Sequence, residues 1–207
     1  MKHFSQLSLD AAQLRRELLE YDLLLRQHES LDERKELLPF FQKREQLAAS
    51  LGFLVHPNIF TPSLLAFEYD IFGDFRADLV VGDPDTHAYC FIEFENAKQG
   101  SILKKSAGRF QPDWSSRFLH GFSQVSDWFR TLENQTRTET FEHRFGAPSI
   151  DYMGILVIGR DSYLDAEGRR RLTWWQDRTL VNSRKVYCFT FDQLLFALQK
   201  SLGGMMG

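Results

Sequence analysis

The sequence contains few cysteines and no long apolar run. Its two cysteines, Cys90 and Cys188, lie inside apolar segments, which argues against a disulfide framework. No apolar run approaches the ~20 residues that a membrane helix needs, and the first residues, MKHFSQLSLD, lack the apolar centre of a signal peptide. We therefore expect a cytoplasmic protein without a membrane partner.

Repeats, low-complexity tracts and sequence-reading motifs are also absent. No helix-turn-helix or zinc-binding pattern occurs, so specific recognition of a nucleic-acid sequence has no visible source. What is present is material for a core: 43% of the residues are hydrophobic, 26% are charged, and 19 are phenylalanine. This balance is typical of a soluble globular protein whose core is rich in aromatic rings.

Charge is distributed unevenly along the chain, although the net charge is only -3. Residues 51–95 carry one basic residue against eight acidic ones, a net charge of -7. Residues 96–207 carry sixteen basic residues against eleven acidic ones, a net charge of +5. An acidic centre with basic surroundings suits a divalent metal beside a phosphate-bearing substrate, although charges on solvated faces would give the same count.

The apolar periodicity predicts an α/β fold with a mixed sheet. Helical patterns cover residues 8–27 and 31–50; Pro39 should interrupt the second helix and Gly52 should end it. Alternating patterns at 64–72, 75–82 and 88–95 predict an antiparallel meander, because turn residues separate them. The remaining elements are a helix, a strand, a helix, a strand and a short helix, at 114–132, 152–159, 165–175, 186–191 and 192–199.

The first helix has a narrow apolar seam whose positions alternate spacings of four and three. The seam residues are Leu7, Ala11, Leu14, Leu18, Tyr21 and Leu25. Such a seam could pair with a second copy of the protein or pack on its own domain. We accordingly predict three parts: an oligomerisation or regulatory helix at 1–30, the main domain at 31–200, and a disordered tail at 201–207. The expected assembly is a homo-oligomer, a dimer or higher.

Three acidic residues interrupt two neighbouring strands of the meander. Glu93 and Glu95 share one face of their strand, roughly 6–7 Å apart, and a suitable register would bring Asp78 beside Glu93. Carboxylates placed opposite each other destabilise a sheet unless a partner compensates their charge. A divalent cation with oxygen ligands would compensate it, and a solvated position at the rim of the sheet is the alternative.

The segments around these acids resemble a known family. The phrases FRADLVVGD, FIEFENAK, RFLHGFSQVSDWF, GILVIGRDS and VNSRKVYCFTFDQL are similar to the nuclease domain of the Shedu family of bacterial antiviral defence proteins, over roughly residues 33–199. The order of elements, with an acid in the second strand and Glu-x-Glu in the third, also resembles the PD-(D/E)xK restriction-endonuclease-like fold. The resemblance implies hydrolysis of DNA with Mg²⁺ or Mn²⁺ as the cofactor.

The resemblance also implies roles for the acids and for one lysine. It makes Asp78 and Glu93 the metal ligands, and Glu95 is a further candidate for a catalytic and metal-binding residue. Glu95 stands where the family pattern has a lysine. Lys98, just past the end of the strand, is therefore predicted to supply the catalytic cation. Some versions of the fold use an acid from the first helix of the domain. The candidates here are Glu33 and Glu36, which lie in the helical pattern of residues 31–50.

Polar residues of the following helix complete the predicted site. Gln124 with Trp128 resembles the glutamine–aromatic pattern of nuclease relatives, and we expect Gln124 to position water or phosphate. Arg117 and His120 share a helix face with Gln124 because they are spaced by three and four residues. They and further basic residues are predicted to contact the phosphates of nucleic acid without sequence preference: Lys104, Lys105, Arg109, Arg169, Arg170 and Arg171.

These observations support two main functions. The first is a metal-dependent DNA endonuclease with little sequence specificity that acts in bacterial defence against phage. The second is a catalytically inactive module of the same fold that binds nucleic acid or a protein partner, which Glu95 in the place of the lysine favours. A third, an unrelated α/β interaction protein, would require that Asp78 and Glu93 do not approach each other.

Overall fold

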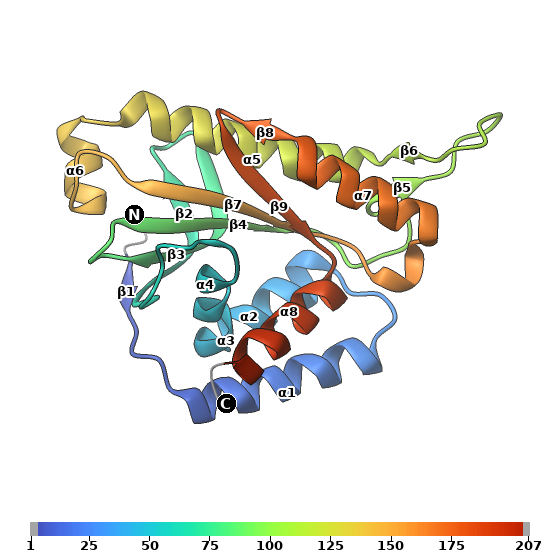
Figure 1. Ribbon diagram of the computed structural model, residues 1–207, viewed down its shortest axis with the longest axis horizontal. Coiled ribbons are helices and arrows are strands. Elements are labelled where there is room, and N and C mark those ends of the chain that lie inside the picture. The colour runs from blue at the N-terminus through green and yellow to red at the C-terminus, as the bar shows by residue number, and fades with distance from the viewer. Residues whose placement is uncertain (1–3, 205–207) are drawn as a thin grey trace.

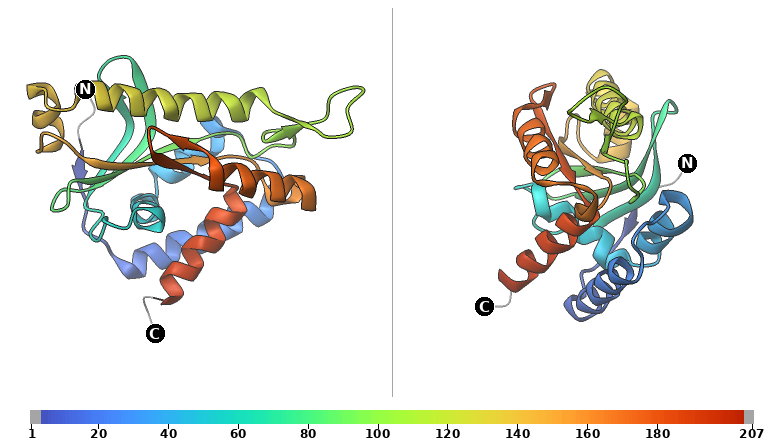
Figure 2. Two further views of the ribbon diagram at one scale, coloured as in Figure 1. Left: turned by 45° about the horizontal axis from the view of Figure 1, so that its top comes forward. Right: turned by 90° about the vertical axis from the view of Figure 1, so that its right-hand side faces the viewer.

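The protein consists of a mixed sheet between two layers of helices (Figures 1 and 2). The computed structural model describes residues 4–204. Its main sheet has seven strands in the order β1-β2-β3-β4-β7-β9-β8, which confirms the predicted α/β class with a mixed sheet. No helix in this described part is long and apolar enough to cross a membrane.

The centre of the sheet is the predicted meander, extended by parallel strands. β2 (Leu64–Ile71), β3 (Phe75–Asp83) and β4 (Ala88–Phe94) pair antiparallel in chain order. β7 (Asp151–Val157) pairs parallel to β4, and β9 (Arg184–Phe189) pairs parallel to β7. The two-residue strands β1 (Ser5–Gln6) and β8 (Leu180–Val181) form the edges. The cysteines of β4 and β9, Cys90 and Cys188, are buried and free, as expected from the sequence.

One face of the sheet is covered by the N-terminal helices and the last helix. They are α1 (Ala11–Gln27), α2 (Leu38–Gln42), α3 (Glu45–Ser50), α4 (Gly52–Val55) and α8 (Phe191–Gly204). The helix predicted over 31–50 is divided at residues 43–44: a π-helical turn η1 (Glu33–Leu37) runs directly into α2, and α3 follows the break. Pro39 lies in the first turn of α2, where a missing N–H donor is tolerated, so the interruption predicted at Pro39 is absent and the break falls at residues 43–44.

Gly52 has a different role from the one predicted. It begins α4 instead of ending the preceding helix. A Cβ atom at this position would lie 2.6 Å from Cγ1 of Val81 in β3. The glycine therefore allows the helical layer to approach the sheet at a distance that a larger residue would prevent.

The apolar seam of α1 packs on its own domain. Its residues Leu14, Leu18, Tyr21 and Leu25 are buried in the core formed with the sheet and α8, and the hydroxyl of Tyr21 donates to the backbone oxygen of Phe191. Asp10 caps the helix by accepting from the backbone N–H groups of Ala12 and Gln13. The seam is thus unavailable to a second copy. The homo-oligomer itself stays a prediction.

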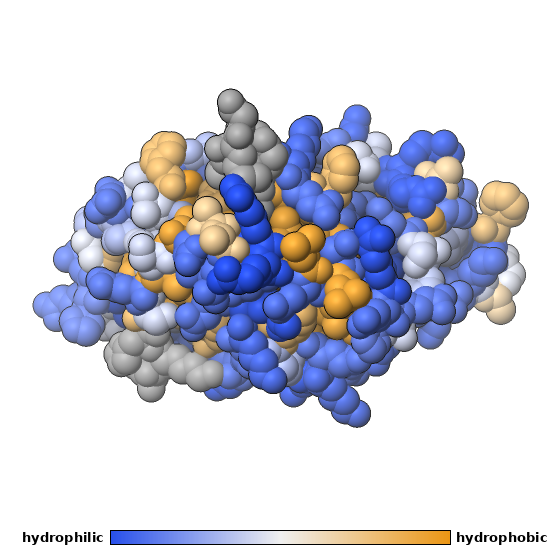
Figure 3. All heavy atoms as spheres, turned by 90° about the horizontal axis from the view of Figure 1, so that it is seen from below, coloured by the Kyte–Doolittle hydropathy of each residue, from blue (hydrophilic) through white to orange (hydrophobic). Residues whose placement is uncertain are grey.

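The outer face of this helical layer is mixed in character. Viewed from the side of α1 and α8, apolar side chains lie between hydrophilic ones (Figure 3). The large apolar residues exposed on these two helices are Leu19, Leu23 and Phe196. Helix α8 continues to Gly204, where the sequence predicted a disordered tail from residue 201; residues 205–207 of that tail lie outside the described part.

The opposite face is covered by three helices and a small hairpin. They are α5 (Ser116–Gln135), α6 (Glu139–Phe145) and α7 (Ala166–Arg178), with a hairpin formed by β5 (Leu103–Lys104) and β6 (Asp113–Trp114). A short 3₁₀ turn, η2 (Asp161–Tyr163), leads into α7. The sequence predicted α5 and α7 within a few residues of their ends but did not predict α6 or the hairpin.

Candidate functional site

A cleft of about 1110 Å³ lies between the two helical layers, beside β3 and β4. Its walls come from η1, α2, the β2–β3 turn, the two strands and α5. Seven residues singled out in the sequence line it together: Glu33, Asp78, Glu93, Glu95, Arg117, His120 and Gln124. The fold therefore gathers most of the predicted catalytic residues in one place.

The register of the meander brings the first two acids together. Leu79 pairs with Ile92 across β3 and β4, so the antiparallel register places Asp78 opposite Glu93. The carboxylate of Asp78 also accepts a hydrogen bond of 2.9 Å from the backbone N–H of Phe94, where the ladder between the strands ends. This arrangement is incompatible with the third hypothesis, in which the two acids do not approach each other.

Glu93 is buried without a full set of hydrogen-bond partners. Only 5% of the residue is exposed, and its Oε2 atom has no hydrogen-bond partner among the described residues. A buried carboxylate oxygen without a partner is costly, because the charged form has lost its hydration without replacement. The floor of the cleft thus holds a group that needs either a proton or a cation.

The pKa values of the two acids reflect this environment. Burial raises the pKa of Glu93 well above its usual value, the negative charges of Asp78, Glu95 and Glu33 raise it further, and a hydrogen bond from Gln124 opposes the rise. Burial likewise raises the pKa of Asp78 to about 7, which the hydrogen bond from Phe94 partly opposes. Both shifts describe the site without a bound cation, which would reverse their direction.

Glu95 differs from Glu93 because both of its oxygens are engaged. Oε2 lies 2.8 Å from Nη1 of Arg117, and Oε1 lies 3.4 Å from Nδ1 of His120. The same Arg117 nitrogen lies 3.2 Å from Oε2 of Glu33, an acid that the sequence offered as a candidate. Arg117 therefore bridges two carboxylates from different layers. The predicted role of Glu95 as a metal ligand stays a prediction.

Helix α5 reaches the acids through a glycine. A Cβ atom on Gly121 would lie 2.7 Å from Cδ1 of Leu156 and 3.2 Å from Cγ of Glu95. A side chain here would push the helix away from the sheet and move Arg117, His120 and Gln124 with it. The sequence carries a signal for this contact that was not used: a glycine inside an amphipathic helix is unfavourable unless close packing requires it.

Lys98 lies away from the cleft. Its ammonium group is 2.8 Å from Oδ2 of Asp32, the residue that caps η1, and its side chain lines a separate small cavity. Glu36, the second acid suggested from the first helix, accepts from the backbone N–H of Asp32 and is not among the residues that line the cleft. Of the two basic residues predicted closest to the acids, Arg117 and Lys98, it is Arg117 that lines the cleft, where Arg34 and Arg76 also lie.

The other predicted phosphate-binding residues divide into two groups. Arg169, Arg170 and Arg171 make contacts within the protein: Arg169 donates to the backbone oxygen of Leu164, Arg170 pairs with Glu167, and Arg171 donates to the backbone oxygen of Pro112. The second group belongs to the hairpin, where Lys104, Lys105 and Arg109 are exposed. Their predicted contacts with nucleic acid stay predictions.

The donor set of the cleft fits a hard divalent cation held by few protein ligands. In the described part of the chain, no three His, Cys, Asp or Glu side chains converge as a complete metal cage. Mg²⁺ commonly uses only one or two carboxylates and takes its other ligands from water and substrate phosphates. Asp78 and Glu93 with its unpaired Oε2 match that minimal set.

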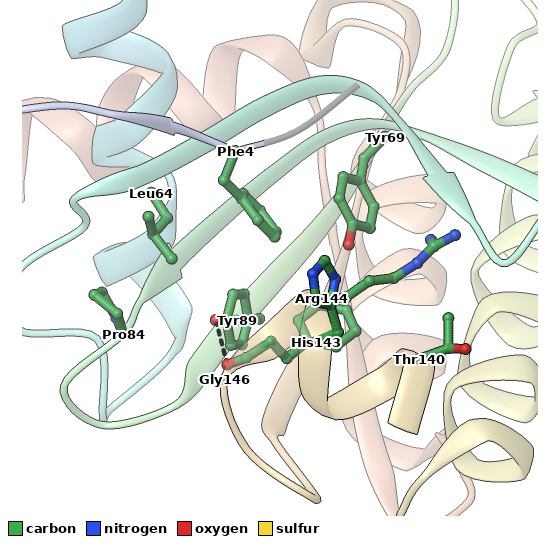
Figure 4. A pocket seen from close by; sticks show the side chains of 10 residues that line it. Phe4, Leu64, Tyr69, Pro84, Tyr89, Thr140, His143, Arg144 and Gly146 are labelled. Carbon is green, nitrogen blue, oxygen red and sulfur yellow. Dashed lines mark hydrogen bonds between the residues drawn. The ribbon is translucent and has the colours of Figure 1, made fainter. Parts of the chain in front are cut away.

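A second cavity, of about 490 Å³, is chemically unlike the cleft (Figure 4). Its walls include the rings of Phe4, Tyr69, Tyr89 and Phe145, and the hydroxyl of Tyr89 donates to the backbone oxygen of Phe145. Arg144 lies at its edge, and its guanidinium is bonded to Asp70. Among the described residues no carboxylate lines this cavity, in contrast to the cleft.

Comparison with known proteins identifies a family for most of the chain. Residues 30–195 match the family model described as the C-terminal region of the Shedu protein SduA. The match contains every acid of the cleft, the hairpin and helices α5 to α7. No match is found among curated proteins.

Proposed function

Because the chain belongs to the Shedu family of antiviral defence proteins, we propose that it is a metal-dependent DNA endonuclease with little sequence specificity. In this proposal the protein hydrolyses phosphodiester bonds of phage DNA in the bacterial cytoplasm. The observation that carries it is the unpaired Oε2 atom of Glu93, buried opposite Asp78 at the floor of a large open cleft.

The proposed roles follow from the positions of the side chains. Asp78 and Glu93 would hold Mg²⁺ or Mn²⁺, which when bound supplies a water activated for attack and neutralises charge on the phosphate. Gln124, which donates a hydrogen bond to Glu93 and lines the cleft, would orient a water or a phosphate oxygen. Stabilisation of the additional negative charge needs a cation close to the acids.

Two cations are candidates for that last role. Lys98 is the sequence-based candidate, but it must leave Asp32 to reach the cleft. Arg117 already lies at the acids, 2.8 Å from Glu95, with 46% of its side chain exposed to the cleft and solvent. Its bidentate geometry also suits phosphate oxygens. We place Arg117 first and Lys98 second.

A cleavage assay tests the proposal. Supercoiled plasmid and linear single- and double-stranded DNA are incubated with the protein in Mg²⁺, Mn²⁺ or EDTA. We expect cutting only with metal, and a loss of roughly 100-fold or more for Glu93→Ala because a ligand is removed. Asp74→Asn is the matched control, because Asp74 lies exposed on the rim of the same cleft.

The same assay ranks the two cations. Arg117→Ala should slow cutting more than Lys98→Ala, and the reverse order would assign the role to Lys98. Cutting that persists in EDTA, or that is unchanged in Glu93→Ala, contradicts the proposal.

The alternative is an inactive module that binds nucleic acid or a protein partner. The observation that favours it is the engagement of both oxygens of Glu95 at the place of the family lysine, together with the Lys98–Asp32 pair. Metal binding without turnover, in a folded wild-type protein that retains DNA binding, would support this second function.

A further inference from the structure

The hairpin of β5 and β6 projects beyond α5 and α7 at one end of the molecule (Figures 1 and 2). Its tip carries Phe110, whose side chain is 100% exposed. A single exposed apolar residue is ordinary on a protein surface. What distinguishes Phe110 is the hairpin that carries it. The base of this hairpin is packed on the helices, its tip is closed by hydrogen bonds, it bears unpaired positive charge, and it lies next to the cleft.

The base of the hairpin is fixed to the helical layer. The backbone N–H of Ser115 donates to Ile102, and Nη1 of Arg171 on α7 donates to the backbone oxygen of Pro112 at 2.6 Å. The ring of Trp114 stacks on Phe118 of α5, with ring centres 4.5 Å apart and planes inclined by 18°. The hairpin is therefore held by both α5 and α7 and is not a loosely attached loop.

The tip also has internal order. Ser106 and Arg109 both donate to the carboxylate of Asp113, each at 2.6 Å, so hydrogen bonds close the loop that presents Phe110. Asp113 balances the charge of Arg109. Lys104 and Lys105 are exposed and have no ion-pair partner among residues 4–204, so they supply the free positive charge of the hairpin.

The hairpin is a direct extension of the cleft wall. Ser115 both closes the hairpin and caps α5, and Arg117 in the first turn of that helix contacts Glu95. Phe110 precedes Ser115 by five residues, a span of no more than about 18 Å for a fully extended chain. A strand bound in the cleft could therefore continue along the hairpin.

We propose that residues 101–115 form a nucleic-acid-binding arm in which Phe110 stacks on an unpaired base while Lys104 and Lys105 contact phosphates of the same strand. The inference rests on the proposed endonuclease function and adds a substrate preference to it. Every base offers an aromatic face, so a stacking contact needs no particular sequence. Insertion into a duplex would first require unstacking, whereas an unpaired base is already available. The arm therefore favours single-stranded over fully paired DNA.

Fluorescence anisotropy with a labelled single-stranded oligonucleotide and the matching duplex tests the arm. The full chain is used in EDTA, so that binding is measured without cutting. We expect Phe110→Ser to weaken single-strand binding by roughly tenfold or more and Phe110→Trp to restore it, because an aromatic face is what the contact requires. The matched control is Phe60→Ser, at a site 73% exposed beside Asp83 at the far end of β3.

Salt dependence separates the two kinds of contact. Replacing both lysines, Lys104→Gln with Lys105→Gln, should reduce the slope of log affinity against log salt concentration by about 1.4, since each phosphate contact on a single strand contributes about 0.7. Phe110→Ser should leave that slope unchanged, because stacking releases no counterion.

The outcomes distinguish this inference from the function on which it rests. Wild-type affinity in Phe110→Ser, or equal losses in Phe110→Ser and Phe60→Ser, overturns the arm even when the wild type cuts DNA. A wild-type protein that neither binds nor cuts DNA overturns the proposed function and the arm together. Thermal melting of each variant checks that the fold is retained.

Discussion

Two groups of buried charge in this protein are balanced in opposite ways. Arg160, 8% exposed, donates to the carboxylate of Asp192 and to the backbone oxygens of Leu25 and His28. Asp192 in turn also accepts from the backbone N–H of Asp161. In the cleft, by contrast, Oε2 of Glu93 has no hydrogen-bond partner within residues 4–204, and the neighbouring charge of Asp78 is of the same sign.

The difference shows which buried charge serves the fold. The Arg160 group ties α1, η2 and α8 together, and its hydrogen bonds replace the hydration that burial removes. The Glu93 group makes fewer such contacts, a bond from Phe94 to Asp78 and one from Gln124 to Glu93, and its unpaired charge costs stability. Such a group is expected where a ligand, and not another part of the chain, completes the set of contacts.

Breaking the balanced group should have the largest effect on stability. Arg160→Met leaves Asp192 and two backbone oxygens without their donor, so we expect a loss of about 3–5 kcal/mol in the free energy of unfolding. Urea denaturation measures it. Arg130→Met is the control, because Arg130 makes an exposed ion pair that is worth at most about 1 kcal/mol. Similar losses for the two variants would show that the Arg160 group is not a structural tie.

The unbalanced group should make stability depend on pH in the absence of metal. In the folded protein the pKa of Asp78 is about 7, above its unfolded value of 3.8, and the pKa of Glu93 is raised above its unfolded value of 4.5. At pH values between the unfolded and the folded pKa, the folded chain therefore binds more protons than the unfolded chain. Stability should therefore be full below about pH 4 for these groups and fall by a few kcal/mol as the pH rises through 7.

Melting temperatures in EDTA at pH 5 and pH 8 measure this effect. Glu93→Gln, which keeps the shape but removes the charge, should melt higher than the wild type at pH 8 and by a much smaller margin at pH 5. Mn²⁺ should recover wild-type stability at pH 8 and do little for Glu93→Gln. A wild-type protein that is equally stable at both pH values in EDTA would contradict an uncompensated charge in the cleft.

A smaller effect should follow from displacing α5. Gly121→Ala places a Cβ 2.7 Å from Leu156 and 3.2 Å from Glu95, and we expect a loss of about 1–2 kcal/mol in stability together with slower cutting. The loss is limited because alanine favours the helix by up to about 1 kcal/mol. Ser123→Ala, an exposed position on the same helix that also lines the cleft, is the control. Unchanged cutting in Gly121→Ala would mean that the position of α5 does not matter for the reaction.

The sequence predicted the parts of the site that depend on local pattern. The meander follows from alternating residues and turn signals. Once its strands pair, their register puts Asp78 opposite Glu93, as the sequence predicted. The interruption predicted at Pro39 was wrong in position, because the π-helical turn runs through Leu38 and Pro39 into α2 and the helical run breaks only at residues 43–44.

Contacts between distant segments were not predictable in the same way. Arg117 bonds to Glu33, which is 84 residues away in the sequence. Lys98 bonds to Asp32, which is 66 residues away, although Glu93 and Glu95 are much nearer to it in the sequence. A long, flexible side chain can reach several partners, and the tertiary arrangement decides among them. The short hairpin and α6 were not predicted for another reason. Two-residue strands and a seven-residue helix are too short to show a clear periodicity.

The bond between Tyr21 and the backbone oxygen of Phe191 has a practical consequence for anyone who wants a shorter version of this protein. The region shared with the family starts after α1 and stops within α8, yet these two helices pack against each other and close one side of the core. The residues that match the family, 30–195, are therefore fewer than the residues that build the core. A fragment cut at the limits of the family match would expose the apolar side of the sheet, so shortened versions should keep both helices.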